Sequence, residues 1–221
     1  MRDYPASDPG APALVLAHGA GAGHDHPWMR RVAAGLAARG VHVVTFDFPY
    51  REAGRKLPDR GTVLEQAFES VWETVSRAAR GPVFAGGKSM GARIASQVAA
   101  RERFAPKPAG LVFFGYPLHP PGKPAQRRDR HLPQIERPLL FLHGTRDPFG
   151  SADELRALVD DLPRARLEIV EGGDHSLSVP KRQDPAGQAL DRAIDVAARW
   201  MTSTMGARES TEPPTTAPPE S

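Results

Sequence analysis

The chain has 221 residues, 40% hydrophobic and 25% charged, which excludes a chain that is disordered throughout and suits one full-sized globular domain. Its net charge of +3 is too small to argue for nucleic-acid binding, and the absence of cysteine excludes disulfides, a thiolate nucleophile and a cysteine zinc site. No apolar run is long enough to span a membrane and residues 1–5 begin no signal peptide, so we expect a cytoplasmic protein without membrane contact.

Six short apolar runs alternate with helical patterns along the chain. Runs that are apolar on both faces and are separated by helices are typical of the strands of a buried parallel sheet. We therefore predict an α/β fold with a mostly parallel sheet of about six strands and helices on both faces. The expected strands are residues 13–17, 41–48, 83–85, 111–114, 139–142 and 167–170.

Four helices have start signals in the sequence. Proline is favoured in the first turn of a helix, and a hydroxyl residue followed three positions later by glutamate forms a capping box. After two of these signals, apolar side chains recur at helical spacing, so the helices should pack on the sheet. The expected starts are Pro27, Thr62 with Glu65, Ser151 with Glu154, and Asp184 before Pro185.

The composition divides the chain into one domain and two terminal segments. Residues 12–202 should form the α/β domain, residues 1–11 an irregular N-terminus, and residues 203–221 a disordered tail rich in Pro, Thr and Glu. Residues 116–137 contain five prolines. This segment either caps the functional site or simply connects two strands, and the sequence favours neither interpretation.

The segment Gly87–Gly91 matches the pattern G-x-S-x-G with Ser89 at its centre. It follows an expected strand and precedes the helical pattern of residues 92–99, which is the setting of a nucleophile elbow. Glycine neighbours allow the sharp turn that exposes the serine hydroxyl. These features predict that Ser89 is a nucleophile.

A serine nucleophile needs a base and an acid that orients the base, in the chain order serine, acid, histidine. Of the four histidines after Ser89, only His175 follows an acid that itself lies just beyond a strand, and that acid is Asp147. Asp153 is the nearest rival, but the capping box already explains it, and Asp174 adjoins His175 too closely to reach its ring. We therefore predict a triad in which His175 takes the proton of Ser89 and Asp147 orients His175.

Acyl transfer also needs backbone donors for the oxyanion. One should be the N–H of Met90, next to the nucleophile, and the other the N–H of Ala20, with Gly21 as the alternative, in the glycine-rich loop after the first strand. We also expect Gly21, Tyr50 and His119 to contact the substrate.

Four segments carry a family resemblance, in the order HGAGAG (18–23), GGKSMG (86–91), GTRDPFG (144–150) and GGDH (172–175). They resemble the α/β-hydrolase superfamily, and specifically its small dienelactone hydrolase-like branch, over about residues 13–201. The likeness extends to an uncharacterised bacterial hydrolase group related to a testis-expressed protein and a chromatin-complex subunit. The resemblance implies an α/β-hydrolase fold without a large lid, with Ser89, Asp147 and His175 as its serine, aspartate and histidine.

Two departures limit what the resemblance implies. Dienelactone hydrolases proper use a cysteine nucleophile, which this chain lacks, so their substrate is not implied. The N-terminal segment is too short for the family's full leading hairpin, so a reduced sheet is expected.

Together these observations predict a serine hydrolase that cleaves a carboxylic ester, thioester or lactone of a small acyl substrate. A noncatalytic binding module of the same fold, or an acyltransferase with the same triad, would have the same residues. The pair His24 and His26 is read as loop residues and not as metal ligands, so no metal and no cofactor is expected. The oligomeric state is left open.

Overall fold

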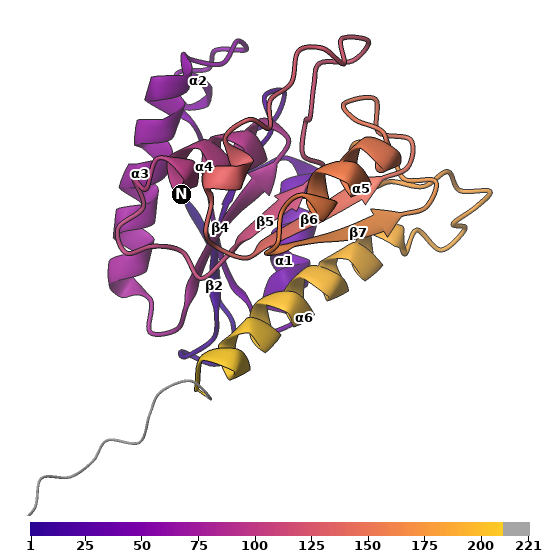
Figure 1. Ribbon diagram of the computed structural model, residues 1–221. Coiled ribbons are helices and arrows are strands. Elements are labelled where there is room, and N and C mark those ends of the chain that lie inside the picture. Colours follow the sequence, from indigo (N-terminus) through magenta and orange to yellow (C-terminus); the bar gives the residue numbers. More distant parts are fainter. Residues whose placement is uncertain (210–221) are drawn as a thin grey trace, which may run out of the picture.

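The structure of the protein, a computed structural model, describes residues 1–209 and is organised around one seven-stranded sheet (Figure 1). The strand order is β1-β3-β2-β4-β5-β6-β7, and every neighbouring pair is parallel except β1 and β3. Because Ala17 at the end of β2 pairs with Gly87 of β4, the loops that follow these two strands emerge side by side. The strands are β1 (Arg2–Tyr4), β2 (Ala13–Ala17), β3 (His42–Phe46), β4 (Val83–Lys88), β5 (Leu111–Phe114), β6 (Leu139–Gly144) and β7 (Ala165–Val170).

Helices cover both faces of the sheet. Leu14 and Leu16 of β2 point into the core beneath α1 and α6, and Val15 between them points into the core beneath α3, α4 and α5. In Figure 1, α6 (yellow) lies below the sheet, and α4 and α5 lie above it. The helices are α1 (Pro27–Ala37), α2 (Pro49–Glu52), α3 (Gly61–Ala78), α4 (Met90–Ala100), the 3₁₀ turn η1 (Leu132–Gln134), α5 (Ala152–Asp160) and α6 (Ala189–Glu209).

The predicted α/β class with a mostly parallel sheet is confirmed, but the N-terminus differs from the prediction. Instead of being irregular throughout, residues 1–11 contain β1, which pairs with β3 from Arg2 opposite Thr45 to Tyr4 opposite Val43. β1 lies at the edge of the sheet and its side chains are exposed or half-buried. It therefore lacks the apolar run that identified the inner strands.

Two of the predicted helix starts are confirmed. α1 begins at Pro27, and the capping box of α5 is complete, with Ser151 Oγ accepting from Glu154 N–H (3.2 Å) and Glu154 Oε2 accepting from Ser151 N–H (2.9 Å). The predicted capping box at Thr62 is wrong, because α3 begins at Gly61 and Glu65 turns inward.

Both ends of α6 differ from the prediction. Asp184 does not open the helix; its carboxylate accepts a hydrogen bond from the N–H of Ala189 (2.7 Å), where α6 begins. The helix continues to Glu209, so residues 203–209 belong to it and not to a separate tail. The rest of the predicted tail, residues 210–221, lies outside the described residues. None of the helices in residues 1–209 is long and apolar enough to cross a membrane.

Glu65 of α3 forms a buried ion pair with two arginines that follow α4. Its side chain is 3% exposed and lies 2.5 Å from Arg101 Nη1 and 3.4 Å from Arg103 Nη1, whereas the two arginine side chains are 52% and 36% exposed. We expect Arg101→Met to lower the free energy of unfolding by about 2 kcal/mol, because it leaves a buried carboxylate with only the longer contact. Glu65→Met should cost less than about 1 kcal/mol, since both guanidinium groups keep their water.

Urea denaturation of the two variants and the wild type measures this difference. A larger loss for Glu65→Met than for Arg101→Met would contradict the prediction.

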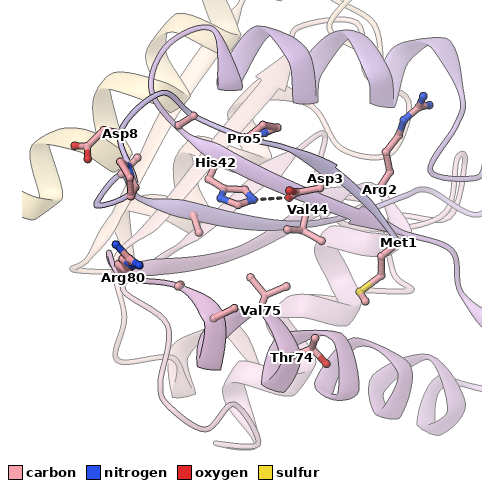
Figure 2. Close-up of a pocket in the computed structure, with 16 residues that line it drawn as sticks. Met1, Arg2, Asp3, Pro5, Asp8, His42, Val44, Thr74, Val75 and Arg80 are labelled. Atoms are coloured by element: carbon pink, nitrogen blue, oxygen red, sulfur yellow. Dashed lines mark hydrogen bonds and ion pairs between the residues drawn. The ribbon is translucent and has the colours of Figure 1, made fainter.

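A groove of about 610 Å³ lies between β1 and the end of α3, at the N-terminal ends of β2 and β3 (Figure 2). Figure 2 shows the ion pair of Asp3 and His42 on its sheet side, with Val75 and Arg80 across from it. Ala13, in the wall of the groove, pairs with Val83 at the start of β4, whereas Ser89 follows the carboxyl end of β4. The groove is therefore separate from the predicted site.

Candidate active site

Ser89 occupies a tight turn between the last residue of β4 and the first residue of α4. Its backbone has φ 53° and ψ −112°, a strained conformation that non-glycine residues rarely adopt. A Cβ at Gly87 would lie 2.8 Å from the carbonyl oxygen of Ala17, and one at Gly91 would lie 2.8 Å from that of His18. The two glycines are therefore needed because the turn packs directly against the end of β2.

Ser89, His175 and Asp147, which are far apart in the sequence, form one chain of hydrogen bonds. His175 Nε2 lies 2.8 Å from Ser89 Oγ, and His175 Nδ1 lies 2.7 Å from Asp147 Oδ2. The Asp147 side chain is fully buried, and its other oxygen accepts a hydrogen bond from Phe149 N–H (2.8 Å). Each carboxylate oxygen thus has a donor, and the imidazole is held with its Nε2 toward the serine.

The three residues follow the carboxyl ends of β4, β6 and β7. Neighbouring parallel strands place their carboxyl ends at one edge of the sheet, where open α/β sheets form their sites. The structure brings together the three residues that the sequence selected.

His143 also lies beside Asp147, but it cannot compete with His175. Its Nε2 lies 2.8 Å from the carbonyl oxygen of Gly150, so Nε2 must carry the proton that this bond uses. Burial lowers the pKa of His143, although the charge of Asp147 opposes the shift. The ring is therefore neutral and adds no positive charge next to Asp147.

The loop that follows β2 passes over Ser89. A Cβ at Gly19 would lie 3.6 Å from Ser89 Cβ. The N–H groups of Met90 and Ala20, the two predicted oxyanion donors, have no acceptor within the described part of the chain. Met90 is the first residue of α4, where backbone N–H groups and the helix dipole favour a negative charge.

Two buried side chains, those of His18 and Tyr50, form hydrogen bonds to the backbone of the loop after β2. His18 Nδ1 lies 2.8 Å from Gly19 O, while its Nε2 accepts from Phe48 N–H (3.2 Å), which requires the neutral ring with the proton on Nδ1. Burial lowers the pKa of His18 and so favours this form. Tyr50 donates its hydroxyl proton to Ala20 O (2.8 Å).

Two of the three residues expected to contact substrate do not line the cavity beside Ser89. Tyr50 is fully buried and supports the loop instead. His119 is also buried. Its ring Nδ1 lies 2.8 Å from Pro120 O, and its backbone N–H donates to Phe149 O (3.0 Å). The prediction that Tyr50 and His119 contact the substrate is therefore corrected: both side chains support the surrounding loops. Gly21, the third residue, does line the cavity.

The cavity beside Ser89 has a volume of about 330 Å³. Two aromatic side chains that were not among the predicted site residues, Trp28 and Phe149, form part of its wall. The ring centroid of Phe149 lies 4.2 Å from that of His175. Phe149 follows Pro148 in the loop after β6, and Trp28 follows Pro27 in the first turn of α1. An aromatic residue close to Asp147 and another shortly after the glycine-rich loop are the sequence features that could have predicted this wall. The lining residues are Gly19, Ala20, Gly21, Ala22, His26, Trp28, Met29, Lys88, Ser89, Phe149, His175 and Ser176.

The proline-rich segment between β5 and β6 packs on α4 and does not cover this cavity. Ser96 Oγ of α4 lies 2.7 Å from His131 Nε2, and Tyr116 donates its hydroxyl proton to Arg128 O (2.8 Å). No residue of the segment lines the cavity beside Ser89. Of the two interpretations that the sequence left open, the structure supports a connection between strands.

The histidines of the segment 24–26 have separate roles. His24 Nε2 lies 3.6 Å from Asp47 Oδ2, and the backbone N–H of His24 donates to Asp47 Oδ1 (2.7 Å). The ring of His26 accepts from Trp28 N–H (3.2 Å) and so caps α1.

A strand, a strained serine turn and a helix at the carboxyl edge of a parallel sheet are features of the alpha/beta hydrolase class. Residues 10–203 match the family model for the alpha/beta hydrolase domain, and the chain belongs to this family. Its predicted membership is thereby confirmed.

Solved structures of the same class resemble the chain over most of its length. Dienelactone hydrolase from Anabaena variabilis has a TM-score of 0.70 at 20% identity, covering 91% of this chain and 89% of that chain. Est1E from Butyrivibrio proteoclasticus, with ferulic acid bound, has a TM-score of 0.70 at 14% identity, covering 90% and 92%. A lidless alpha/beta serine hydrolase from Xanthomonas campestris has a TM-score of 0.66 at 17% identity, covering 89% and 86%. These likenesses show the shared fold, and residues 1–209 contain no large lid.

Proposed function

We propose that the protein is a serine hydrolase that cleaves a carboxylic ester, thioester or lactone. The observation that carries this proposal is the hydrogen-bonded chain from Ser89 Oγ through His175 to the buried Asp147. A serine hydroxyl becomes an effective nucleophile when a base is within hydrogen-bond reach and a third group orients that base. The family membership of the chain supports hydrolase chemistry.

In the proposed reaction, Ser89 Oγ attacks the acyl carbonyl carbon while His175 Nε2 takes its proton. Asp147 stabilises the imidazolium, which then gives the proton to the leaving oxygen or sulfur as the acyl–leaving group bond breaks. Water, deprotonated by His175, attacks the acyl-enzyme, and the proton returns to Ser89 as the carboxylic acid leaves. A lactone opens by the same steps with its leaving group still attached.

The negative charge that develops on the carbonyl oxygen requires fixed donors. We assign this role to the N–H groups of Met90 and Ala20, which have no other acceptor among residues 1–209. Removing one such donor from a serine hydrolase costs about 3 to 4 kcal/mol of transition-state stabilisation. His18 and Tyr50 hold Gly19 and Ala20 in place for this purpose.

Labelling with a fluorophosphonate probe tests the proposal directly. The wild type should be labelled on one serine, and Ser89→Ala should abolish labelling while circular dichroism shows an unchanged fold. A folded wild type that resists the probe would favour a noncatalytic binding module. Labelling that survives in Ser89→Ala would show that another residue is the nucleophile.

The cavity size predicts a preference for short acyl chains. A volume of about 330 Å³ is near the lower limit for small-molecule sites, and its wall includes Trp28, Met29 and Phe149. Each buried methylene contributes about 0.8 kcal/mol, so kcat/KM should rise roughly fourfold per carbon from the acetyl to the butyryl ester. It should then fall, because longer chains leave the cavity. p-Nitrophenyl esters from C2 to C16 measure this; a rise that continues to C16 would contradict it.

A further inference from the structure

Lys88 precedes the proposed nucleophile, and its side chain reaches across the site to the loop that carries His175. The residue is 9% exposed, and its Nζ donates a hydrogen bond to the carbonyl oxygen of His175. The ammonium group also lies 5.5 Å from the centroid of the Trp28 ring, within the range of a cation–π contact. A buried cation in this position needs such partners.

Trp28 holds the next carbonyl of the same loop. Its Nε1–H donates to the oxygen of Ser176 at 2.9 Å, and its ring packs edge-to-face on Phe114 of β5, with centroids 5.7 Å apart. Two consecutive carbonyls are therefore held by side chains from two other elements, β4 and α1. We call Lys88 and Trp28 the histidine-loop clamp.

The loop needs such a clamp because His175 has to meet two partners at once. Its ring must keep one position, because Nε2 lies 2.8 Å from Ser89 Oγ and Nδ1 lies 2.7 Å from Asp147 Oδ2 at the same time. Leu177, two residues on, has φ 59°, a backbone conformation rare for a leucine. Small displacements of a reacting group lower rates by up to about 100-fold.

We propose that Lys88 is a positioning residue that, together with Trp28, fixes His175 between Ser89 and Asp147. This inference rests on the proposed hydrolase function for its catalytic consequence. Lys88 acts through the backbone of His175, so its loss should affect the chemical step more than substrate binding.

The charge of Lys88 gives this role a pH dependence. Burial lowers the pKa of Lys88 to about 8, although Asp147 and Asp174 raise it. The ammonium is therefore present below about pH 8 and is lost above it, which weakens the hydrogen bond to His175. The charged groups that act on its pKa are Asp147 and Asp174, and the other titratable side chains that line the same cavity are His175 and His26, the N-cap of α1.

Lys88→Met tests the role, because methionine has a similar length but no donor and no charge. We expect kcat for a short ester to fall about 10- to 100-fold with KM changed less than threefold, the size of effect given by losing one charge-assisted hydrogen bond. The alkaline limb of the wild-type rate profile near pH 8 should disappear. Lys88→Arg, which stays charged, should recover part of the rate and move that limb above pH 10.

Two further variants complete the experiment. Trp28→Phe keeps an aromatic face but removes the Nε1–H donor, and it should lower kcat in the same direction by about 3- to 10-fold. Lys123→Met removes an exposed lysine from a loop outside the cavity and should change neither kcat nor the pH profile.

A second readout does not depend on hydrolysis. The Nδ1–H proton of His175, bonded to a buried carboxylate, should give a downfield proton resonance in the wild type that broadens in Lys88→Met. An unchanged kcat, or a rise in KM alone, would overturn the positioning role, the latter because it would place Lys88 in contact with substrate. If the wild type resists the fluorophosphonate probe, the hydrolase proposal fails, while an unchanged His175 resonance in Lys88→Met would separately overturn the clamp.

Discussion

Replacing Asp147 by asparagine should lower kcat for ester hydrolysis about 10⁴-fold and leave KM nearly unchanged. The carboxylate accepts hydrogen bonds from His175 Nδ1 and from Phe149 N–H, through different oxygens. An amide nitrogen facing His175 would donate to Nδ1 and force the proton onto Nε2, the atom that must accept the proton of Ser89. The imidazolium would also lose its negative partner. Steady-state kinetics with a short p-nitrophenyl ester measures the change.

Asp153→Asn is the matched control, since Asp153 was the nearest rival in the sequence. Its side chain is 92% exposed and pairs with Arg156 of the same helix. The substitution should leave kcat within twofold of the wild type. If Asp147→Asn kept more than about a tenth of the activity, Asp147 would not be the acid that orients His175.

Replacing Gly144 by alanine should destabilise the protein and abolish its activity together. Gly144 ends β6, three residues before Asp147, and a Cβ there would collide with the carbonyl oxygen of Gly173 and lie 2.6 Å from that of Asp174. The backbone of both loops is fixed at this point, because Gly173 O accepts from Arg146 N–H at 2.8 Å. The methyl group must therefore push the loop of Asp147 away from the loop of His175.

We expect a loss of about 3 kcal/mol in the free energy of unfolding, at the upper end of overpacking effects. For a chain of this size that corresponds to a fall in Tm of roughly 6 to 12 °C, which calorimetry measures. Gly61→Ala is the control: Gly61 begins α3, a Cβ there has only Glu65 Oε1 nearby at 3.9 Å, and the change should stabilise by about 0.5 kcal/mol. A Tm for Gly144→Ala equal to that of the wild type would contradict the collision.

Local sequence patterns predicted the inner part of the fold well. The strand at residues 111–114 was predicted with its observed bounds, and the capping box at Ser151 was also correct. Two of the wrong predictions, at β1 and at Glu65, have a common cause. β1 forms because β3 offers it a free edge, and Glu65 turns inward because Arg101 lies across from it on a distant segment. Neither partner is visible in a local window.

Some residues of the predicted site can also be identified from local sequence, and others cannot. Ser89 can be identified, because its glycine neighbours and its place between a strand and a helix are local features of the sequence. Tyr50 and His119 were misassigned because loops at one edge of a sheet place some side chains toward the cavity and others beneath it. Only packing decides which: the Tyr50 hydroxyl turns to Ala20 and the His119 ring turns to Pro120.

The sequence by itself determined the chemistry available to this protein: a serine in a glycine-flanked turn, an aspartate and a histidine after later strands, and no cysteine. Tertiary structure decided the distances that make these groups one unit and the contacts that hold them there. The clamp of Lys88 and Trp28 on the carbonyls of residues 175 and 176 joins segments about 90 to 150 positions apart. Residue types follow from local pattern, but such contacts depend on how separate strands and loops pack together, which no local pattern specifies.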